Sequence, residues 1–302
     1  MACTVKIVSR TKVIYSFDPG HEPSAHVKPG ERVLLQTQDA FGGQIRRESD
    51  SVADLDWSKV DGATGPIFVE NAEKGDTLKV EILDIRTERV GVVVTVPKYG
   101  ILGKSKFNPA TMVVNIRGKH IHFEEGIQIR ADPMIGTIGV TPETGSVPTG
   151  SLGKHGGNMD VKEVRTGSKL YLPVFMDGAL FAAGDMHAVQ ADGELCVSAI
   201  EVAGEALLKF DLIKNRQPEW PILETDECFA VLACGDSLED AARFSTETAV
   251  RALMRQHSWP FEKAYMFGSL AIDLRINQVV DPKKGVRASI SKKYMGLSSL
   301  LT

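Results

Sequence analysis

The sequence predicts a mainly β fold, with a β-sandwich-like core of short strands and a pair of helices near the C-terminus. Residues 1–235 show short β-branched runs separated by many of the 28 glycines, and no long stretch there has helical periodicity. Residues 236–302 change to helical patterning with a closing strand. The 302 residues contain no repeat or linker, so we expect one domain.

The strands before residue 235 are recognised by alternation and by turn residues. Residues 77–85 alternate apolar and polar side chains, which is typical of a half-buried strand. Residues 112–117 and 120–123 flank Gly118-Lys119, which predicts a hairpin. The expected strands are residues 77–85, 90–96, 112–117, 120–123, 170–175 and 195–202.

The C-terminal part predicts two helices and a final strand. Ser237 is placed to cap a helix over 238–255, whose apolar residues share one face. A second helix is expected to begin at Pro260, because proline suits the first helical position. Residues 272–276 fit either a strand or an extension of that helix, and 287–291 predict the closing strand.

Composition excludes several classes of protein. The chain is 43% apolar and 25% charged, and 35 Lys+Arg against 39 Asp+Glu give a net charge of −4, so we expect neither nucleic acid nor a membrane as partner. Its apolar runs are far shorter than the ~18 residues of a membrane-spanning helix, and a signal peptide is not recognisable. We therefore expect a cytoplasmic protein with reduced thiols at Cys3, Cys196, Cys228 and Cys234.

A first polar cluster surrounds the Gly156-Gly157 pair. His155, Asn158 and Asp160 place an imidazole, a carboxamide and a carboxylate around glycines that allow close approach to a ligand. Asn158 and Asp160 are two positions apart and would face the same side of an extended segment. The alternative is a surface turn in which Asn158 and Asp160 bind only backbone N–H groups.

A second polar cluster follows about 25 residues later. Asp185 and His187 again have the i, i+2 spacing of one strand face, and a carboxylate with an imidazole suits Zn²⁺ or a similar ion. Further oxygen ligands or general bases are Gln190, Asp192, Glu194 and Glu201, although Asp192-Gly193 also fits a turn. Two such clusters close together in sequence indicate a polar metal site.

Two acidic residues further upstream are also candidates. Asp39 follows the apolar run 33–35 and precedes Gly42-Gly43, so it fits either a turn or a site. Glu70 lies just outside the apolar run 67–69, and its role stays open.

Taken together, these motifs resemble the acetamidase/formamidase family from about Val13 to Lys293. The pair formed by His-Gly-Gly-Asn-Met-Asp at 155–160 and Gly-Asp-Met-His-x-x-Gln-x-Asp-Gly-Glu at 184–194 is highly specific. Other matching segments are Gln38-Asp39-Ala40, Gly65-Pro66-Ile67 with Glu70, Ala199-Ile200-Glu201, Asp273-Leu274-Arg275-Ile276 and Gln278-Val279-Val280-Asp281.

The resemblance implies a cytoplasmic amidohydrolase that cleaves short aliphatic amides of the formamide and acetamide type to a carboxylate and ammonia. It also implies a β-sandwich-like core, a homodimer or higher homo-oligomer, and a divalent metal, Zn²⁺ or alternatively Ca²⁺. On this hypothesis the metal ligands are Asp160 and His187, then Asp39, with Asp185 and His155 as alternates. The proton shuttle is Glu194, with Glu70 and Glu201 as alternates, and Asn158 orients the substrate or binds the same ion.

Two other functions remain open at this point. One is a metal-independent amidase whose nucleophile is Cys196 or Cys234. The other is a β-sandwich module that binds Ca²⁺ or a small ligand without catalysis, because acidic and amide side chains near Gly-Gly turns suit oxygen coordination.

Overall fold

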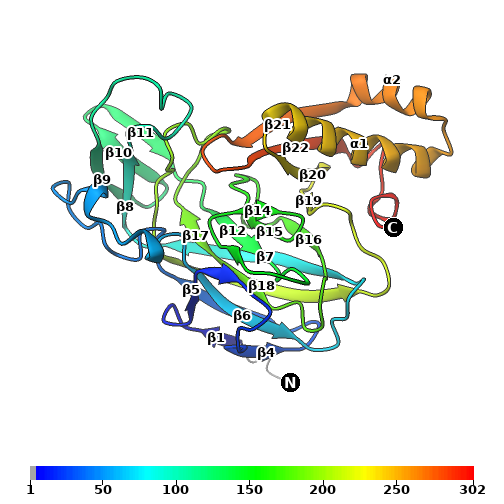
Figure 1. Ribbon diagram of the computed structural model, residues 1–302, viewed down its shortest axis with the longest axis horizontal. Helices are drawn as coiled ribbons and strands as arrows, with labels where there is room; N and C mark the ends of the chain where they lie inside the picture. Colours follow the sequence, from blue (N-terminus) through cyan, green and yellow to red (C-terminus); the bar gives the residue numbers. More distant parts are fainter. Residues whose placement is uncertain (1–4) are drawn as a thin grey trace.

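The computed structural model describes residues 5–302, so Cys3 lies outside the described residues. The chain folds into a mainly β structure with two C-terminal helices, as predicted (Figure 1). The largest sheet has nine strands in the order β1 (Lys6–Val8), β5 (Arg32–Thr37), β18 (Gly204–Ile213), β7 (Thr77–Thr87), β16 (Lys169–Pro173), β19 (Ile222–Glu224), β20 (Cys228–Gly235), β22 (Lys284–Ser291) and β21 (Ile272–Gln278).

A second sheet packs on the first. Its order is β14 (Leu152–Gly153), β15 (Gly156–Asn158), β12 (Met134–Gly139), β17 (Phe181–His187), β6 (Ala63–Val69) and β2 (Val13–Ile14), with β4 (Ala25–Val27) also paired to β6. Phe181 of this sheet meets Phe210 of the nine-stranded sheet edge to face, with ring centroids 5.0 Å apart. One buried apolar cluster contains residues of both sheets, so the sandwich-like core is confirmed.

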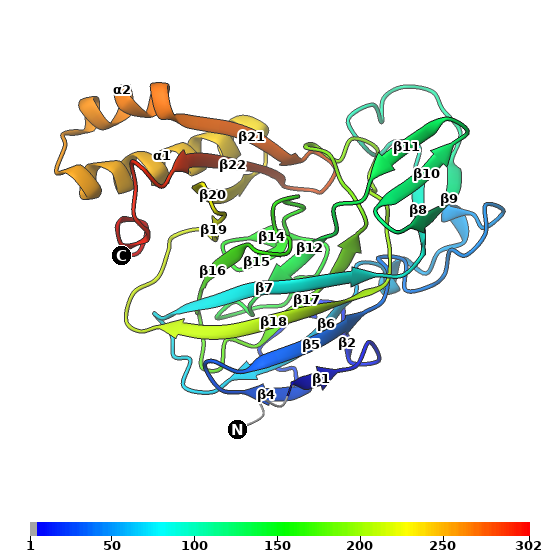
Figure 2. The ribbon, with the colours of Figure 1, turned by 180° about the vertical axis from the view of Figure 1, so that it is seen from behind.

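The remaining strands form smaller units. A four-stranded sheet projects from the body in the order β11 (Ile127–Arg130), β10 (His120–Glu124), β9 (Ala110–Arg117) and β8 (Val90–Thr95) (Figure 2). A two-stranded pair joins β3 (Ser16–Phe17) and β13 (Val147–Pro148). The predicted hairpin is confirmed, because β9 and β10 pair antiparallel with His120 opposite Arg117. The strands expected at 77–85, 90–96 and 170–175 are found as β7, β8 and most of β16.

The strand expected at 195–202 is wrong. Val197 has φ of 87°, which an extended strand does not permit, and the segment crosses β8 as a series of turns. Its own side chains take the backbone hydrogen bonds that a ladder would use: Ala199 N donates to Glu201 Oε1 at 2.8 Å, and Val94 N donates to Ser198 Oγ at 2.9 Å.

The C-terminal helices lie over one end of the nine-stranded sheet. α1 (Leu238–His257) begins after Ser237, whose hydroxyl accepts from Asp240 N at 3.1 Å, which confirms the predicted cap. α2 (Phe261–Ala271) begins one residue later than expected, because Pro260 has an extended backbone and precedes the helix. The ambiguous 272–276 segment is strand β21, and it pairs with the closing strand β22. Among residues 5–302 no helix has the length and apolar character needed to span a membrane.

Candidate functional site

The two polar clusters meet where three neighbouring strands of the second sheet lie side by side. β12 pairs with β15 on one side and with β17 on the other. Asp160 lies two residues after the end of β15, whereas Asp185 lies within β17. Gly136 of β12 lies under both carboxylates, because a Cβ added there would collide with oxygens of Asp160 and Asp185. The glycine therefore allows two acidic groups to approach one another.

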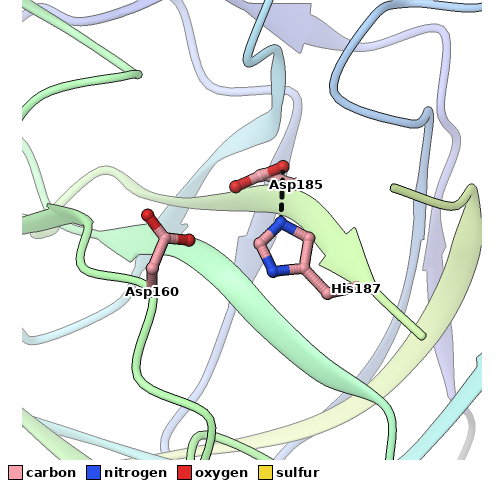
Figure 3. A group of neighbouring side chains, drawn as sticks. All are labelled: Asp160, Asp185 and His187. Carbon is pink, nitrogen blue, oxygen red and sulfur yellow. Dashed lines mark hydrogen bonds and ion pairs between the residues drawn. The ribbon is translucent and has the colours of Figure 1, made fainter. Parts of the chain in front are cut away.

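His187 is the centre of this cluster, and its side chain is 1% exposed. Its Nε2 lies 3.2 Å from Asp185 Oδ1 and 3.1 Å from Glu201 Oε2, and its Nδ1 lies 2.9 Å from Gln190 Oε1. Figure 3 shows the imidazole ring of His187 directed at Asp185, with the carboxylate of Asp160 to one side of this pair. The i, i+2 spacing on β17 thus brings Asp185 and His187 together.

The segment that fails to form a strand supplies two more carboxylates. Glu201 forms an isolated β-bridge with His187, and Glu194 lies at the start of the same series of turns. The ligand atoms of His187, Glu194 and Glu201 lie within 4.8 Å of one another, as do those of Asp160, Asp185 and His187. His187 therefore belongs to two groups that each have the donor set of a cation site.

The electrostatics of the cluster favour a positively charged occupant. Among residues 5–302, neither carboxylate oxygen of Asp160 has a hydrogen-bond partner, and the nearest charged group to Glu201 Oε2 is His187 Nε2 at 3.1 Å. Buried carboxylates without partners are costly, and a bound cation removes that cost. A donor set of carboxylates with one imidazole suits Zn²⁺ and related ions better than Ca²⁺, which takes oxygen ligands. The residues present therefore offer the donor set of a divalent cation site.

Backbone strain gathers at the same place. Asp61, Asp160, Asp185 and Glu194 all have φ between 44° and 56°, a region that residues other than glycine rarely adopt. Val197 is the more unusual case, because a β-branched side chain at φ of 87° is strongly disfavoured. Such conformations typically persist at functional sites, where the surrounding structure enforces them.

The proton affinities of most acids in the cluster are raised, whereas the pKa of Asp185 is lowered, because the effect of its burial is outweighed by His187. Burial, followed by the charge of Asp185, raises the pKa of Asp160 to about 7. Burial also raises the pKa of Glu201 to about 8 and, with the charge of Asp160, raises that of Glu194 well above its usual value. Burial alone would lower the pKa of His187, but Glu201 and Asp185 raise it. The cluster therefore retains protons unless a cation replaces them.

A small cavity of about 80 Å³ opens onto the cluster. Its polar lining consists of Asp61, Asn158, Asp185, Glu194, Glu201 and Asp281. Its apolar lining includes Phe41, Trp57, Val60, Val94 and Val197. At ~30 Å³ per water molecule, the cavity has room for about three waters, or for one organic molecule of comparable size.

Some predicted site residues lie elsewhere. Asp39 pairs with Arg46 at 3.1 Å and accepts from Gly43 N at 3.0 Å, so its carboxylate organises the Gly-Gly turn. Glu70 follows β6 and does not line the cavity. His155 packs edge to face on Phe17, with centroids 5.1 Å apart, and belongs to neither cation group.

Burial, with the nearby Lys283, lowers the pKa of His155 to about 4, so this ring is a neutral core group. Asp192, which was considered as an oxygen ligand, pairs instead with Arg287 at 2.6 Å and with Lys162 at 3.0 Å. Neither residue is therefore part of the polar cavity.

Asn158 lines the cavity together with Asp281, to which it is hydrogen-bonded. Its Oδ1 accepts from Thr137 Oγ1 at 2.9 Å, and its Nδ2 donates to Asp281 Oδ2 at 3.2 Å. Asp281 and Asp61 were not among the predicted site residues. Asp281 belongs to a segment that carried the family resemblance, which was a usable signal. The sequence contained no signal for Asp61, because the position of its side chain depends on a left-handed backbone conformation in a loop.

Within residues 5–302, the two cysteines that were considered as nucleophiles, Cys196 and Cys234, do not line the cavity. Cys234 is buried, its Sγ donates to Leu152 O at 3.5 Å, and burial raises the pKa of its thiol to about 11. Cys196 directs its Sγ to Ser198 O at 3.5 Å and is not part of the cavity lining. A thiolate is therefore disfavoured at Cys234, contrary to the usual effect of a helix N-terminus.

Known proteins resemble this chain over most of its length. The model of the acetamidase/formamidase family matches residues 8–147 and 144–290. An acetamidase structure from Bacillus halodurans is 36% identical, with a TM-score of 0.94, over 97% of this chain and 99% of that chain. A structure described as a predicted acetamidase/formamidase from Thermoanaerobacter tengcongensis is also 36% identical, with a TM-score of 0.94, over 98% of each chain.

A curated formamidase from Methylophilus methylotrophus is 29% identical, over 63% of this chain and 61% of that protein. The chain thus spans about three fifths of the length of this relative.

Proposed function

The chain belongs to the acetamidase/formamidase family, and we propose on that basis that it hydrolyses short aliphatic amides to a carboxylate and ammonia. One structural observation carries the proposal: a cavity of about 80 Å³ joins an apolar wall to a cluster of carboxylates around His187. Ligand sites for drug-sized molecules usually have ~300–1,000 Å³. The cavity therefore suits a substrate of few atoms, such as formamide or acetamide.

We further propose that Asp160, Asp185 and His187 hold a divalent cation, with Zn²⁺ as the expected ion. Their ligand atoms lie within 4.8 Å of one another, and both oxygens of Asp160 lack another partner among residues 5–302. Gln190 supports this role because its Oε1 lies 2.9 Å from His187 Nδ1, which leaves Nε2 facing the carboxylates. A divalent ion held there supplies Lewis acidity, which polarises a carbonyl oxygen and acidifies water.

Glu194 is the proposed proton carrier. It lines the cavity, is 7% exposed and lies in the group that contains His187 and Glu201. Its carboxylate takes a proton from water as the water oxygen adds to the amide carbon. It then gives this proton to the nitrogen as the C–N bond breaks, so that ammonia leaves and the carboxylic acid product remains, which ionises to the carboxylate by losing its proton to ammonia or water. Glu201 is less free to move, because Ala199 N donates to its Oε1 at 2.8 Å.

Asn158 and Asp281 also line the cavity and are hydrogen-bonded to each other. Asn158 is fixed by Thr137 and Asp281, so its amide presents a fixed orientation to a ligand. We propose that this pair orients the amide group of the substrate. The apolar residues, among them Phe41 and Val197, then contact its acyl group.

The decisive experiment measures metal content and ammonia release on the same samples. Wild-type protein is treated with a chelator and reloaded with Zn²⁺ or Ca²⁺, and each sample is assayed with formamide, acetamide and longer amides. We expect activity to follow the metal content, and Asp160→Asn to lose both the metal and at least 100-fold in kcat/KM. Glu70→Gln, which changes an acid outside the cavity, is the matched control and should keep both.

Each outcome separates one part of the proposal from another. Full turnover by rigorously metal-free protein would contradict the role of the cation but not the amidase activity. Metal binding without ammonia release from any short amide would favour the non-catalytic binding module. Loss of activity in Cys196→Ala or Cys234→Ala, with metal content unchanged, would favour the cysteine amidase.

A further inference from the structure

The turn between β21 and β22 carries two residues of the cavity lining. β21 ends at Gln278 and β22 begins at Lys284, and Val280 and Asp281 of the turn line the cavity. In Figures 1 and 2 the tip of this hairpin points towards the end of β17, the strand that carries Asp185. The position of Asp281 in the cavity therefore depends on the conformation of a turn that belongs to the C-terminal part of the chain.

The side chain of Gln278 fixes the conformation of this turn. Gln278 is 0% exposed, and its Oε1 accepts from Val280 N at 2.7 Å and from Asp281 N at 3.0 Å. Its Nε2 donates to Lys283 O at 2.8 Å. One carboxamide therefore bonds to three residues of the turn, with its acceptor on one side and its donor on the other. A side chain without both kinds of polar atom cannot close the turn in this way.

The first part of the turn is anchored independently of this side chain. Gly193 N donates to Asn277 O at 2.9 Å, and Val279 N donates to Gly193 O at 3.1 Å. These backbone bonds join the hairpin to the segment that carries Glu194. Loss of the Gln278 carboxamide should therefore release the turn from residue 280 onwards, while the segment of Glu194 stays in place.

The carboxylate of Asp281 lies among like charges. Burial, followed by the charges of Asp160, Asp61 and Asp185, raises the pKa of Asp281 well above its ordinary value. Such repulsion favours movement of the side chain out of the cavity towards solvent. Asn158 Nδ2 donates to Asp281 Oδ2, but this bond is 3.2 Å long. The closed turn is therefore a second restraint that keeps Asp281 beside Asn158.

We propose that Gln278 is a positioning residue for the substrate: it holds the turn so that Asp281 can fix the carboxamide of Asn158. This inference rests on the proposed function, in which Asn158 and Asp281 orient the amide group of the substrate. The contacts are continuous, because Gln278 binds the N–H of Asp281 and Asp281 accepts from Asn158. Thr137 Oγ1 donates to the other end of that carboxamide at 2.9 Å. None of these four residues belongs to the two groups of candidate cation ligands, so the effect should fall on substrate binding and not on the cation.

The test measures kcat, KM and metal content for Gln278→Leu, with formamide and acetamide as substrates. Leucine has a similar size but no polar atom in its side chain, so the turn loses all three bonds. We expect KM to rise about tenfold and kcat to change less than about threefold, because the lost binding energy is shared by the ground state and the transition state. Metal content should stay unchanged. Gln278→Glu keeps the length and the acceptor but not the amide donor, so its KM should lie between those of wild-type protein and Gln278→Leu.

Asp76→Ala is the matched control for the general effect of an opened turn. It also leaves two backbone N–H groups without an acceptor, but Asp76 lies outside the cavity lining. Its KM and kcat should equal those of wild-type protein. A rise in KM that occurs in the Gln278 variants and not in Asp76→Ala is then specific to the turn at the cavity.

A double-variant cycle with Asp281→Ala shows whether Gln278 acts through Asp281. Because Asp281→Ala removes the carboxylate that the turn positions, adding Gln278→Leu should raise KM by no more than about twofold further. Two results overturn the inference and leave the proposed function standing: a wild-type KM in the folded Gln278 variants, and a rise in KM that multiplies with that of Asp281→Ala. Wild-type protein that releases no ammonia from any short amide would instead contradict the proposed function, and this inference with it.

Discussion

Asp76, which directly precedes β7, and Asp160, beside the polar cavity, are both 1% exposed, yet their surroundings are opposite. Asp76 accepts from Glu73 N at 2.9 Å and Asn215 N at 2.8 Å, and it pairs with Lys214 at 2.6 Å. The two oxygens of Asp160 have no partner within residues 5–302. Burial would raise the pKa of Asp76, but Lys214 and the two N–H groups lower it.

The difference separates a structural carboxylate from a functional one. At Asp76 the fold supplies every partner that the charge needs, so the charge stabilises the native state. At Asp160 the carboxylate has no hydrogen-bond partner among residues 5–302, the backbone has φ of 48°, and the carboxylate of Asp185 lies nearby. Burial of an acid is therefore a weak sign of function, whereas burial without satisfaction, combined with strain, is a strong one.

The largest expected effect is on the reaction. Glu194→Gln should lower kcat by about 10²–10⁴-fold, because the amide cannot carry the proton. Its free energy of unfolding should stay equal or rise, since an acid buried against Asp160 is removed. Steady-state kinetics and urea denaturation of the same preparations check both statements.

Asp192→Asn is the control for this variant, because Asp192 lies in the same segment but is paired with Arg287. It should keep kcat within a few-fold of wild type. A Glu194→Gln variant with wild-type kcat would remove Glu194 from the mechanism and leave Glu201 as the remaining carboxylate in that group.

The next effect is on stability alone. Asp76→Ala should lower the free energy of unfolding by about 2–3 kcal/mol, because it leaves two backbone N–H groups without an acceptor and removes the buried carboxylate that Lys214 contacts. Glu73→Ala removes the other carboxylate that Lys214 contacts, but that side chain is 68% exposed, so its cost should stay below about 0.5 kcal/mol. Both variants should keep wild-type kcat/KM. Comparable losses in the two variants would contradict the distinction drawn for Asp76.

The features that the sequence predicted correctly depend on residues that are close to one another in the chain. The i, i+2 spacing of Asp185 and His187 predicted a shared strand face, and β17 confirms that they lie together. The Ser237 cap with the apolar face that follows it predicted α1, and the Gly118-Lys119 turn predicted the β9–β10 hairpin, because both elements are determined by local contacts. Local patterns identified Asp160, Asp185 and His187 because they are close in sequence or share a motif.

The rest depends on contacts that no local pattern specifies. Residues 195–202 alternate like a strand, but Glu201 and Ser198 form hydrogen bonds with the backbone and fold the segment into turns. From the sequence, Asp39 fits a site as well as a turn. The structure decides between the two, because Arg46 pairs with its carboxylate. Asp61 enters the cavity through a left-handed backbone, and φ cannot be inferred from an aspartate in a loop.

A smaller effect is expected at the apolar wall of the cavity. Val197→Ala should raise kcat/KM for propionamide or butyramide relative to acetamide by about tenfold, because a pocket change of one methylene is worth ~1–3 kcal/mol. Val197→Gly should raise the same ratio of kcat/KM values. Its free energy of unfolding should be higher than that of Val197→Ala, because glycine accepts φ of 87° without strain.

Val93→Ala on β8 is the matched control for the wall. Val93 packs against the main core, whereas its neighbour Val94 lines the cavity. Val93→Ala should lower the free energy of unfolding without changing the ratio of kcat/KM for the longer amide to kcat/KM for acetamide. An unchanged ratio in both Val197 variants would mean that the acyl group does not contact this residue.

The sharpest comparison is the dependence of stability on pH in protein stripped of metal. The folded pKa of Asp160 is raised to about 7, above the value of about 3.9 for an unfolded aspartate, so the native state keeps a proton that the unfolded state loses. Its contribution to stability therefore falls as pH rises from about 4 to about 7. Asp76 has a lowered folded pKa, so its contribution is present above about pH 4 and is lost below it.

Urea denaturation between about pH 3 and pH 8 should resolve the two signs. Asp160→Asn should reduce the fall toward neutral pH, to which Glu194 and Glu201 also contribute, and Asp76→Asn should reduce the loss at acid pH. If Asp160→Asn left the fall unchanged, the titration would belong to Glu194, Glu201 or Asp61 instead. Adding Zn²⁺ should then reverse the slope of wild-type protein, because the cation competes with the proton for the same carboxylates and binds more tightly as pH rises.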